Sequence, residues 1–259
     1  MVENMNKTVD INGVTTAYME EGNGIPVVLM HGWGQNKEMM IHVFDHLKDR
    51  FRVVSLDFPG FGESGLPPEA WGVIEYEKFF EQFLETIGID RVILIGHSFG
   101  CRVEIRFAAE NPQRVIRMVL TGAAGIRPKH DLKWHIATKT YKLGKFVLKI
   151  TGQKGRLQEL QKNAGSEDYR NAVGIMKPTF VKVVNDDIAP LLHSVTCPVL
   201  LVWGDLDTAA PLWMGQQMEK EMKDAGLAVF EGDDHWAYWH QSDRFNAVID
   251  VFVKEDEQA

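Results

Sequence analysis

The chain has few cysteines, no long apolar run and no repeated segment, and each absence narrows the class of protein. Only two of its 259 residues are cysteine, Cys101 and Cys197, and each lies beside an apolar run. We therefore expect buried free thiols and no disulfide. No stretch reaches the roughly 18 apolar residues of a membrane span, and the polar opening segment is unlike a secretory signal. A cytoplasmic location is the default expectation.

Basic residues are also fewer than acidic residues. The formal net charge is −8 at pH 7, which disfavours nonspecific binding to nucleic acid because phosphate backbones attract basic surfaces. Neither cysteine has the spacing of a metal ligand, so we expect no metal and no cofactor. With 45% hydrophobic and 25% charged residues, the composition is typical of one globular domain with a large core.

Short apolar runs recur along the chain and predict a sheet. They are rich in Val, Ile and Leu and lack alternation, which is typical of strands covered on both faces of a parallel sheet. Segments with helical periodicity, 73–88 and 99–111, lie between them. A hairpin across Asn12-Gly13 is expected at one edge. The runs lie at 25–30, 51–56, 91–95, 115–120, 198–202 and 227–230.

The alternation of strand and helix breaks after the strand at 115–120. Residues 127–194 have a helical pattern throughout, and strand character returns at Pro198. We therefore divide the chain into an α/β core, 1–126 and 195–259, and a helical lid, 127–194. An insertion at a strand end usually lies over the carboxyl edge of the sheet, where open α/β folds bind ligands.

The most specific motif is Gly96-His97-Ser98-Phe99-Gly100, which fits G-x-S-x-G. It follows the apolar run 91–95 and opens the helical segment 99–111, which is the strand-turn-helix setting of a nucleophile elbow. The turn is so sharp that a side chain at either glycine would strike neighbouring backbone. The motif predicts Ser98 as a nucleophile, at a helix N-terminus that favours developing negative charge. The alternative is a glycine-rich turn without chemistry.

A serine hydroxyl needs a base that takes its proton. Of the nine histidines, His235 is best placed because it follows the last apolar run, 227–230. His240 is the alternative base. His97 adjoins the nucleophile, His31 belongs to a loop near the site, and the remaining histidines fit helix or surface positions: His42, His46, His130, His135 and His193.

The base needs a carboxylate that fixes its tautomer. Enzymes with this elbow supply the three residues in the order Ser, acid, His. The run 115–120 ends without an acid, whereas the run 198–202 leads into Asp205 and Asp207. Asp207 lies deeper in the loop and is the predicted acid. Asp205 is the alternative, and its other expected role is to cap the turn or face solvent.

An oxyanion hole requires two N–H groups aimed at one point. One is expected from Phe99, the residue after the nucleophile. The other is expected from Trp33, in the glycine-flanked turn His31-Gly32-Trp33-Gly34. A tight turn with a packed tryptophan is the structural alternative.

Together these motifs resemble those of the α/β-hydrolase superfamily, in family order. The likeness covers nearly the whole chain except the lid. It implies an α/β-hydrolase fold: a mostly parallel central sheet with helices on both faces and a lid inserted after the sixth strand. The segments that carry it are HGWG at 31–34, DFPGFGES at 57–64, GHSFG at 96–100, WGDLD followed by Pro211, and GDDHW at 232–236.

Within the superfamily, HGWG and PGFG resemble most the carboxylesterases and the methyl esterases of acyl-carrier-bound pimelate. Hydrolases that cleave carbon–carbon bonds of aromatic ring-fission products also have a helical lid at this point. Serine at position 98 argues against dehalogenases and epoxide hydrolases, whose nucleophile is aspartate. The resemblance implies that the turn at 57–62 is structural.

The lid is basic. Ten basic and two acidic residues lie between Arg127 and Lys162, against a net charge of −8 for the whole chain. One interpretation is a solvated lysine face; the other is that the lid steers an anionic substrate, an effect that salt would weaken. Aromatic residues near the motifs are candidates for the pocket wall: Trp33, Phe99, Trp134, Trp236 and Trp239.

These observations favour a serine hydrolase that cleaves a carboxylic ester through an acyl-enzyme. Its partner is a small-molecule ester or acyl compound, with an anionic one left open. Carbon–carbon hydrolysis of a vinylogous diketone by the same residues is the alternative reaction, and a ligand-binding protein without turnover is the alternative class. The sequence indicates no oligomeric state.

Overall fold

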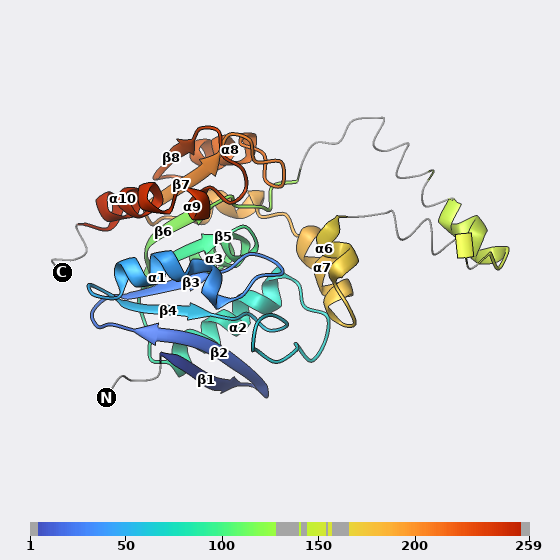
Figure 1. The fold of residues 1–259 in the computed structure, drawn as a ribbon, viewed down its shortest axis with the longest axis horizontal. Coiled ribbons are helices and arrows are strands. Elements are labelled where there is room, and N and C mark those ends of the chain that lie inside the picture. The colour runs from blue at the N-terminus through green and yellow to red at the C-terminus, as the bar shows by residue number, and fades with distance from the viewer. Residues whose placement is uncertain (1–4, 128–139, 141–143, 154, 157–165, 255–259) are drawn as a thin grey trace.

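One eight-stranded sheet organises the described part of the chain (Figure 1). In the computed structural model the described residues are 5–127, 140, 144–153, 155–156 and 166–254. The strand order is β1-β2-β4-β3-β5-β6-β7-β8. The strands are β1 Asn6–Ile11, β2 Val14–Glu21, β3 Pro26–Met30, β4 Arg52–Leu56, β5 Val92–His97, β6 Val115–Thr121, β7 Val199–Gly204 and β8 Ala225–Phe230.

Most of the sheet is parallel, as the apolar runs predict. Strands β3 to β8 pair in parallel, whereas β1 pairs antiparallel with β2, and β2 pairs antiparallel with β4. The β1–β2 turn places Asn12 at φ 52° and Gly13 at φ 83°. Two successive left-handed residues match the twist of a two-residue hairpin, which confirms the predicted edge hairpin.

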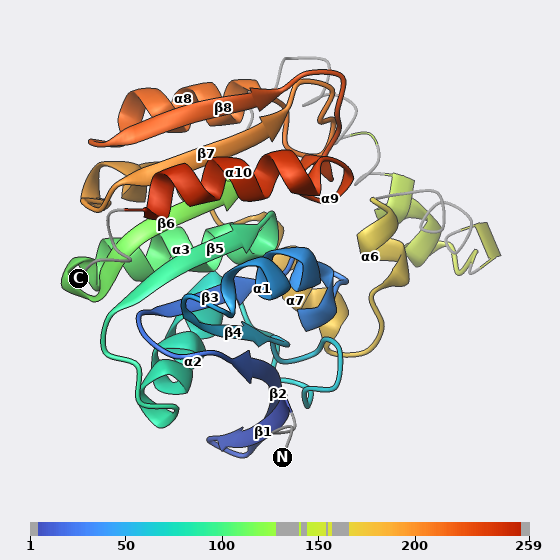
Figure 2. The same ribbon diagram turned by 60° about the vertical axis from the view of Figure 1, so that its left-hand side comes forward.

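Helices cover both faces of the sheet (Figure 2). On one face pack α2 (Val73–Thr86), α3 (Phe99–Glu110) and α8 (Trp213–Glu221); on the other pack α1 (Ile41–Leu47), α9 (Ala237–His240) and α10 (Ser242–Val253). Neighbouring residues of one strand bury apolar side chains on opposite faces, as Val27 and Val28 do in β3. The strands read as unbroken apolar runs because both faces are covered.

The insertion begins after β6, the sixth strand. Its described helical parts include residues 144–150, α6 (Glu167–Asn171) and α7 (Met176–Val184), and the chain returns to the core through a 3₁₀ helix at Ala189–Ser194. Helix α7 packs on the core through Met176 and Val183. The bounds 127–194 for the lid stay a prediction.

Two further predictions concern the cysteines and membrane-spanning helices. Cys101 and Cys197 are both free and buried, which confirms the prediction of buried free thiols. Among the described helices, none combines the length and the apolar character that crossing a membrane requires.

Candidate active site

The turn between β5 and α3 holds Ser98 in a strained conformation. Ser98 has φ 50° and ψ −100°, a left-handed region that side chains rarely adopt. Its amide donates to the Thr121 carbonyl oxygen at 3.0 Å, which ties the turn to the neighbouring strand. A Cβ at Gly100 would lie 2.5 Å from the Met30 carbonyl oxygen. Glycine is therefore required there for α3 to start so close to β3.

A buried aspartate holds the ring of His235. Asp207 follows β7 with its side chain fully buried, and its Oδ2 lies 2.7 Å from His235 Nδ1. Its Oδ1 accepts hydrogen bonds from the Ala209 and Ala210 amides, each at 2.8 Å. An ionised carboxylate only accepts, so Nδ1 carries the proton of the neutral ring and Nε2 is left as the acceptor.

Gly122, at the end of β6, makes room for this pair. It has φ 53°, and a Cβ there would lie 3.0 Å from His235 Nδ1 and 3.4 Å from Asp207 Oδ2. The sequence ending Thr121-Gly122-Ala123 offers no acid of its own. It provides instead the backbone surface against which the histidine–aspartate pair lies.

Ser98 and His235 line one cavity of about 350 Å³ at the carboxyl edge of the sheet. Trp33 and Phe99 line it as well. The volume lies within the range of small-molecule sites. The geometry therefore brings the predicted nucleophile, base and oxyanion loop to one space, with the predicted acid behind the base.

The alternative acid and base lie elsewhere. Asp205 is exposed, and its Oδ1 accepts the Gly232 amide at 2.7 Å, so it joins the loops after β7 and β8. His240 is half exposed and places Nδ1 2.8 Å from Asp233 Oδ1. Neither residue lines the cavity that holds Ser98.

Two buried histidines support the site without facing a substrate. Burial lowers the pKa of His97 well below its ordinary value, and its Nε2 lies 3.0 Å from the His235 carbonyl oxygen. Burial lowers the pKa of His31 to about 4. His31 Nε2 accepts the Phe58 amide at 3.1 Å, which locks the loop after β3 onto the turn after β4. Both rings are therefore neutral structural links.

The loop after β3 presents Trp33 to the cavity. Gln35 shapes this loop: its Oε1 accepts the Gly32 amide at 3.0 Å, and its Nε2 lies 3.1 Å from His97 Nδ1. Among the hydrogen bonds within the described residues, none uses the amide of Trp33 or of Phe99. Both donors are thus available to a ligand. The Trp33 ring also packs edge-on to Phe61, with centroids 4.9 Å apart. The structural alternative, a turn with a packed tryptophan, therefore also describes Trp33.

The other aromatic candidates for the pocket wall differ in where they lie. Trp236 lines the cavity beside His235. Trp239 is not among the residues that line this cavity, and its ring centroid lies 4.6 Å from that of His42 on α1. These contacts give no support to the prediction that Trp239 forms part of the pocket wall. Trp134 lies outside the described residues.

Sequence reasoning missed three charged residues near the site. Arg102 lines the cavity, and burial lowers the pKa of its guanidinium to about 10. Asp168 on α6 lines it from the insertion. Glu104 is wholly buried below the elbow, where a Cβ at Gly96 would lie 2.5 Å from its Oε1. Arg102 and Glu104 are charged residues within the helix that opens at the elbow, which was the available signal; nothing in the sequence pointed to Asp168.

The turn at 57–64 is built around one carboxylate. Asp57 is fully buried, and its Oδ1 accepts the Lys37 amide at 2.6 Å while its Oδ2 lies 3.2 Å from Lys37 Nζ. Its Oδ2 also accepts the Glu63 amide at 2.9 Å. These bonds give Asp57 the structural role that the resemblance implies.

One group of described residues has the atom types of a metal site. Asp233, Asp234 and His240 place one ligand atom each within 4.8 Å of one another. The oxygens of Asp233 already accept hydrogen bonds, one of them from Gln241 Nε2 at 2.9 Å. The group lies outside the cavity of Ser98, so it has no part in the chemistry considered below.

Comparisons with known proteins agree with this fold. A profile of the alpha/beta hydrolase fold family matches residues 25–135, and a profile described as TAP-like protein matches residues 181–258. The chain is 25% identical to a 2-hydroxy-6-oxo-6-phenylhexa-2,4-dienoate hydrolase of Comamonas testosteroni, over 95% of this chain and 93% of that protein.

Solved structures share the whole architecture. A meta-cleavage product hydrolase from Pseudomonas fluorescens IP01 superposes with a TM-score of 0.74 at 23% identity, over 97% of this chain and 98% of the other. A thermophilic esterase from Thermogutta terrifontis superposes with a TM-score of 0.72 at 19% identity, over 98% and 100%. With its sheet order, its elbow and these matches, the chain belongs to the α/β-hydrolase superfamily.

Proposed function

We propose that the chain hydrolyses a carboxylic ester through an acyl-enzyme, with Ser98 as nucleophile, His235 as base and Asp207 as the orienting acid. The observation that carries the proposal is the 2.7 Å contact between Asp207 and His235 Nδ1, because it leaves Nε2 as a proton acceptor in the cavity that Ser98 lines. A base held in this tautomer is what a serine hydroxyl needs for activation.

The reaction follows from these positions. His235 Nε2 takes the hydroxyl proton as Ser98 Oγ attacks the carbonyl carbon, and the amides of Trp33 and Phe99 donate to the resulting oxyanion. The imidazolium then gives its proton to the departing alcohol, which leaves an acyl group on Ser98. A water molecule, deprotonated by His235, attacks that acyl group. The bond between Ser98 Oγ and the acyl carbon then breaks, the imidazolium returns its proton to Oγ, and the acid is released. Asp207 stabilises the imidazolium in both halves of the cycle.

Carbon–carbon hydrolysis is the second candidate, and the comparisons favour it specifically. Two relatives that match 90% or more of this chain, at 25% and 27% identity, are 2-hydroxy-6-oxo-6-phenylhexa-2,4-dienoate hydrolases. The same serine, histidine and aspartate would serve a vinylogous diketone, with altered roles. The esterase among the structural neighbours shares the fold at 19% identity, so the fold by itself supports both reactions.

A substrate screen tests the proposal. Wild-type protein and Ser98→Ala are assayed against p-nitrophenyl esters of increasing acyl length and against 2-hydroxy-6-oxo-6-phenylhexa-2,4-dienoate. We expect ester hydrolysis by the wild type only, with the higher kcat/KM on an ester. A higher kcat/KM on the dienoate would establish the second candidate. No turnover of either class would overturn the assignment as a hydrolase.

A further inference from the structure

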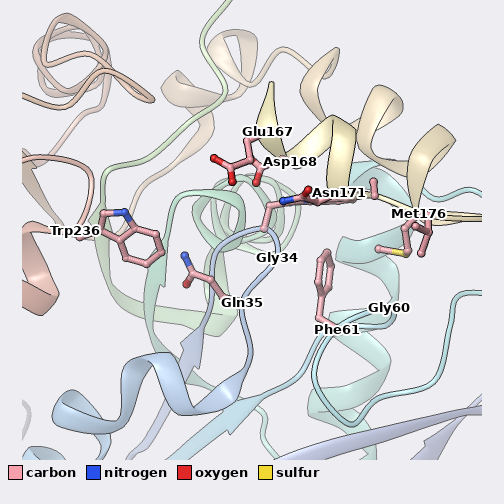
Figure 3. A pocket seen from close by; sticks show the side chains of 12 residues that line it. Gly34, Gln35, Gly60, Phe61, Glu167, Asp168, Asn171, Met176 and Trp236 are labelled. Carbon is pink, nitrogen blue, oxygen red and sulfur yellow. The ribbon is translucent and has the colours of Figure 1, made fainter. Parts of the chain in front are cut away.

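A second cavity adjoins the one that holds Ser98, and two carboxylates line it. Its volume is about 460 Å³, and it shares Trp33, Gln35, Asp168 and Trp236 with the first. Glu167 and Asp168 come from the first turn of α6 and lie opposite the loop of Gln35 (Figure 3). We call this space the outer cavity. Because the two cavities share these four lining residues, they lie side by side.

The two carboxylates lack a counterion within the described residues. Neither Glu167 nor Asp168 takes part in an ion pair there. Burial first, and the charge of Glu167 second, raise the pKa of Asp168. The nearby Lys177 ammonium lies over the Tyr169 ring, 4.6 Å from its centroid. Among the described residues that line this cavity, the charged side chains are therefore the two carboxylates.

Aromatic rings form the other walls of the outer cavity. Trp33 and Phe61 meet edge-on, and Trp236 stands across from Phe61 (Figure 3). The faces of tryptophan and phenylalanine attract cations through their quadrupoles. Carboxylates beside aromatic side chains favour an organic ammonium group over a neutral group of the same shape.

The one buried cation of the inner cavity does not reverse this preference. A guanidinium nitrogen of Arg102 donates to the carbonyl oxygens of Val183 and Asp186, at 3.1 and 2.9 Å. It ties α3 to the end of α7. Arg102 lines the inner cavity and not the outer one. Among the described residues that line the outer cavity, the charged ones are therefore Glu167 and Asp168.

We propose that the outer cavity binds an organic ammonium group, so that the ester substrate is one that carries a positive charge a few bonds from the scissile carbonyl. This inference rests on the proposed function for its reacting bond. The binding of the cation itself does not, because the outer cavity is formed by residues other than Ser98.

Equilibrium binding tests the cation site without turnover. Choline and 3,3-dimethylbutan-1-ol have the same shape and differ in one nitrogen and one charge, and their binding is followed by calorimetry. We expect choline to bind about tenfold more tightly, and Asp168→Asn or Glu167→Gln to reduce that ratio. The matched control is Asp90→Asn, which removes one exposed charge at the opposite edge of the sheet and should leave the ratio unchanged.

Ester hydrolysis tests the substrate class. Butyrylthiocholine and 3,3-dimethylbutyl thiobutyrate form the corresponding matched pair, and we expect a higher kcat/KM for the cationic ester, with a ratio that falls in Asp168→Asn. Equal binding of choline and its neutral analogue, or a ratio that Asp168→Asn does not change, would overturn the inference. Tighter choline binding without hydrolysis of either ester would instead overturn the proposed function and leave the cation site in place.

Discussion

Two aspartates near His235 differ in how the protein holds them. Asp207, in the core, is fully buried and accepts hydrogen bonds from two backbone amides and from the imidazole. Asp168, on the insertion, lines both cavities, and no described residue forms an ion pair with it. A carboxylate that must fix a neighbouring side chain is satisfied by the fold, whereas one left without partners is available to a ligand.

The largest expected effect separates Asp207 from its neighbour in the same loop. Asp207→Asn should lower kcat by about 10⁴-fold, because an amide facing Nδ1 favours the wrong tautomer of His235. Asp205→Asn should stay within a few fold, since Asp205 only accepts the Gly232 amide. Steady-state kinetics on one ester measures both. The reverse ranking would reassign the orienting role to Asp205.

A smaller effect on activity should come from Gly122, the backbone on which the His235–Asp207 pair lies. Gly122→Ala places a Cβ 3.0 Å from His235 Nδ1, and a displaced base should lower kcat/KM by roughly 10- to 100-fold. The control is Gly88→Ala, which has a similar left-handed φ of 70° and no atom within 4 Å of its Cβ. Both variants should lose about 1 kcal/mol of stability from backbone strain. Equal activities in the two variants would contradict the account.

The core also holds a carboxyl group that no described partner satisfies. Glu104 is wholly buried, neither oxygen has a hydrogen-bond partner among the described residues, and burial raises its pKa well above the ordinary value. A raised pKa in the folded state means that stability falls as pH rises from the ordinary pKa toward the folded one.

Glu104→Gln removes that ionisation and so tests whether the stability of the wild type falls as the pH rises. We expect the melting temperature of the variant, minus that of the wild type, to increase as the pH rises above the ordinary glutamate pKa of about 4.3. Taking the difference at each pH cancels the titration of all other groups. A difference that stays constant or decreases with pH would show that Glu104 is not held neutral in the fold.

The smallest expected effect concerns long-range charge. If the carboxylates of α6 govern substrate charge, added salt should lower kcat/KM of a cationic ester by about twofold relative to a neutral one. If the basic segment between Arg127 and Lys162 steers an anionic substrate, the anionic ester should lose rate instead. Assays of the cationic, neutral and anionic esters over a series of salt concentrations show whether the α6 carboxylates or the basic segment governs the charge of the substrate.

The same division between core and insertion explains what the sequence could predict. The strands were predicted because unbroken runs such as Ile25–Met30 occur where both faces are buried. The elbow was predictable because only glycine fits at Gly100, against the Met30 carbonyl. The choice of Asp207 over Asp205 came from depth in the loop, and the 2.7 Å contact with His235 agrees with it.

Positions that depend on tertiary packing were not predictable. Trp239 follows His235 by four residues, but α9 directs it to His42 rather than to the cavity. Asp168 belongs to an exposed helix of five residues, whose charges look like any solvated surface until α6 is placed over the Gln35 loop. Arg102 and Glu104 lie in a helix with an apolar pattern, and their burial appears only when α3 packs between the sheet and α7.

Covalent labelling tests the central claim most directly. The protein is exposed to a fluorophosphonate, digested and analysed by mass spectrometry, with Ser98→Ala and His235→Ala in parallel. The account predicts one adduct, on the peptide that contains Ser98, absent from the first variant and strongly slowed in the second. An adduct that persists in Ser98→Ala, or a wild-type protein that takes none, would contradict it and leave a binding protein with the hydrolase fold.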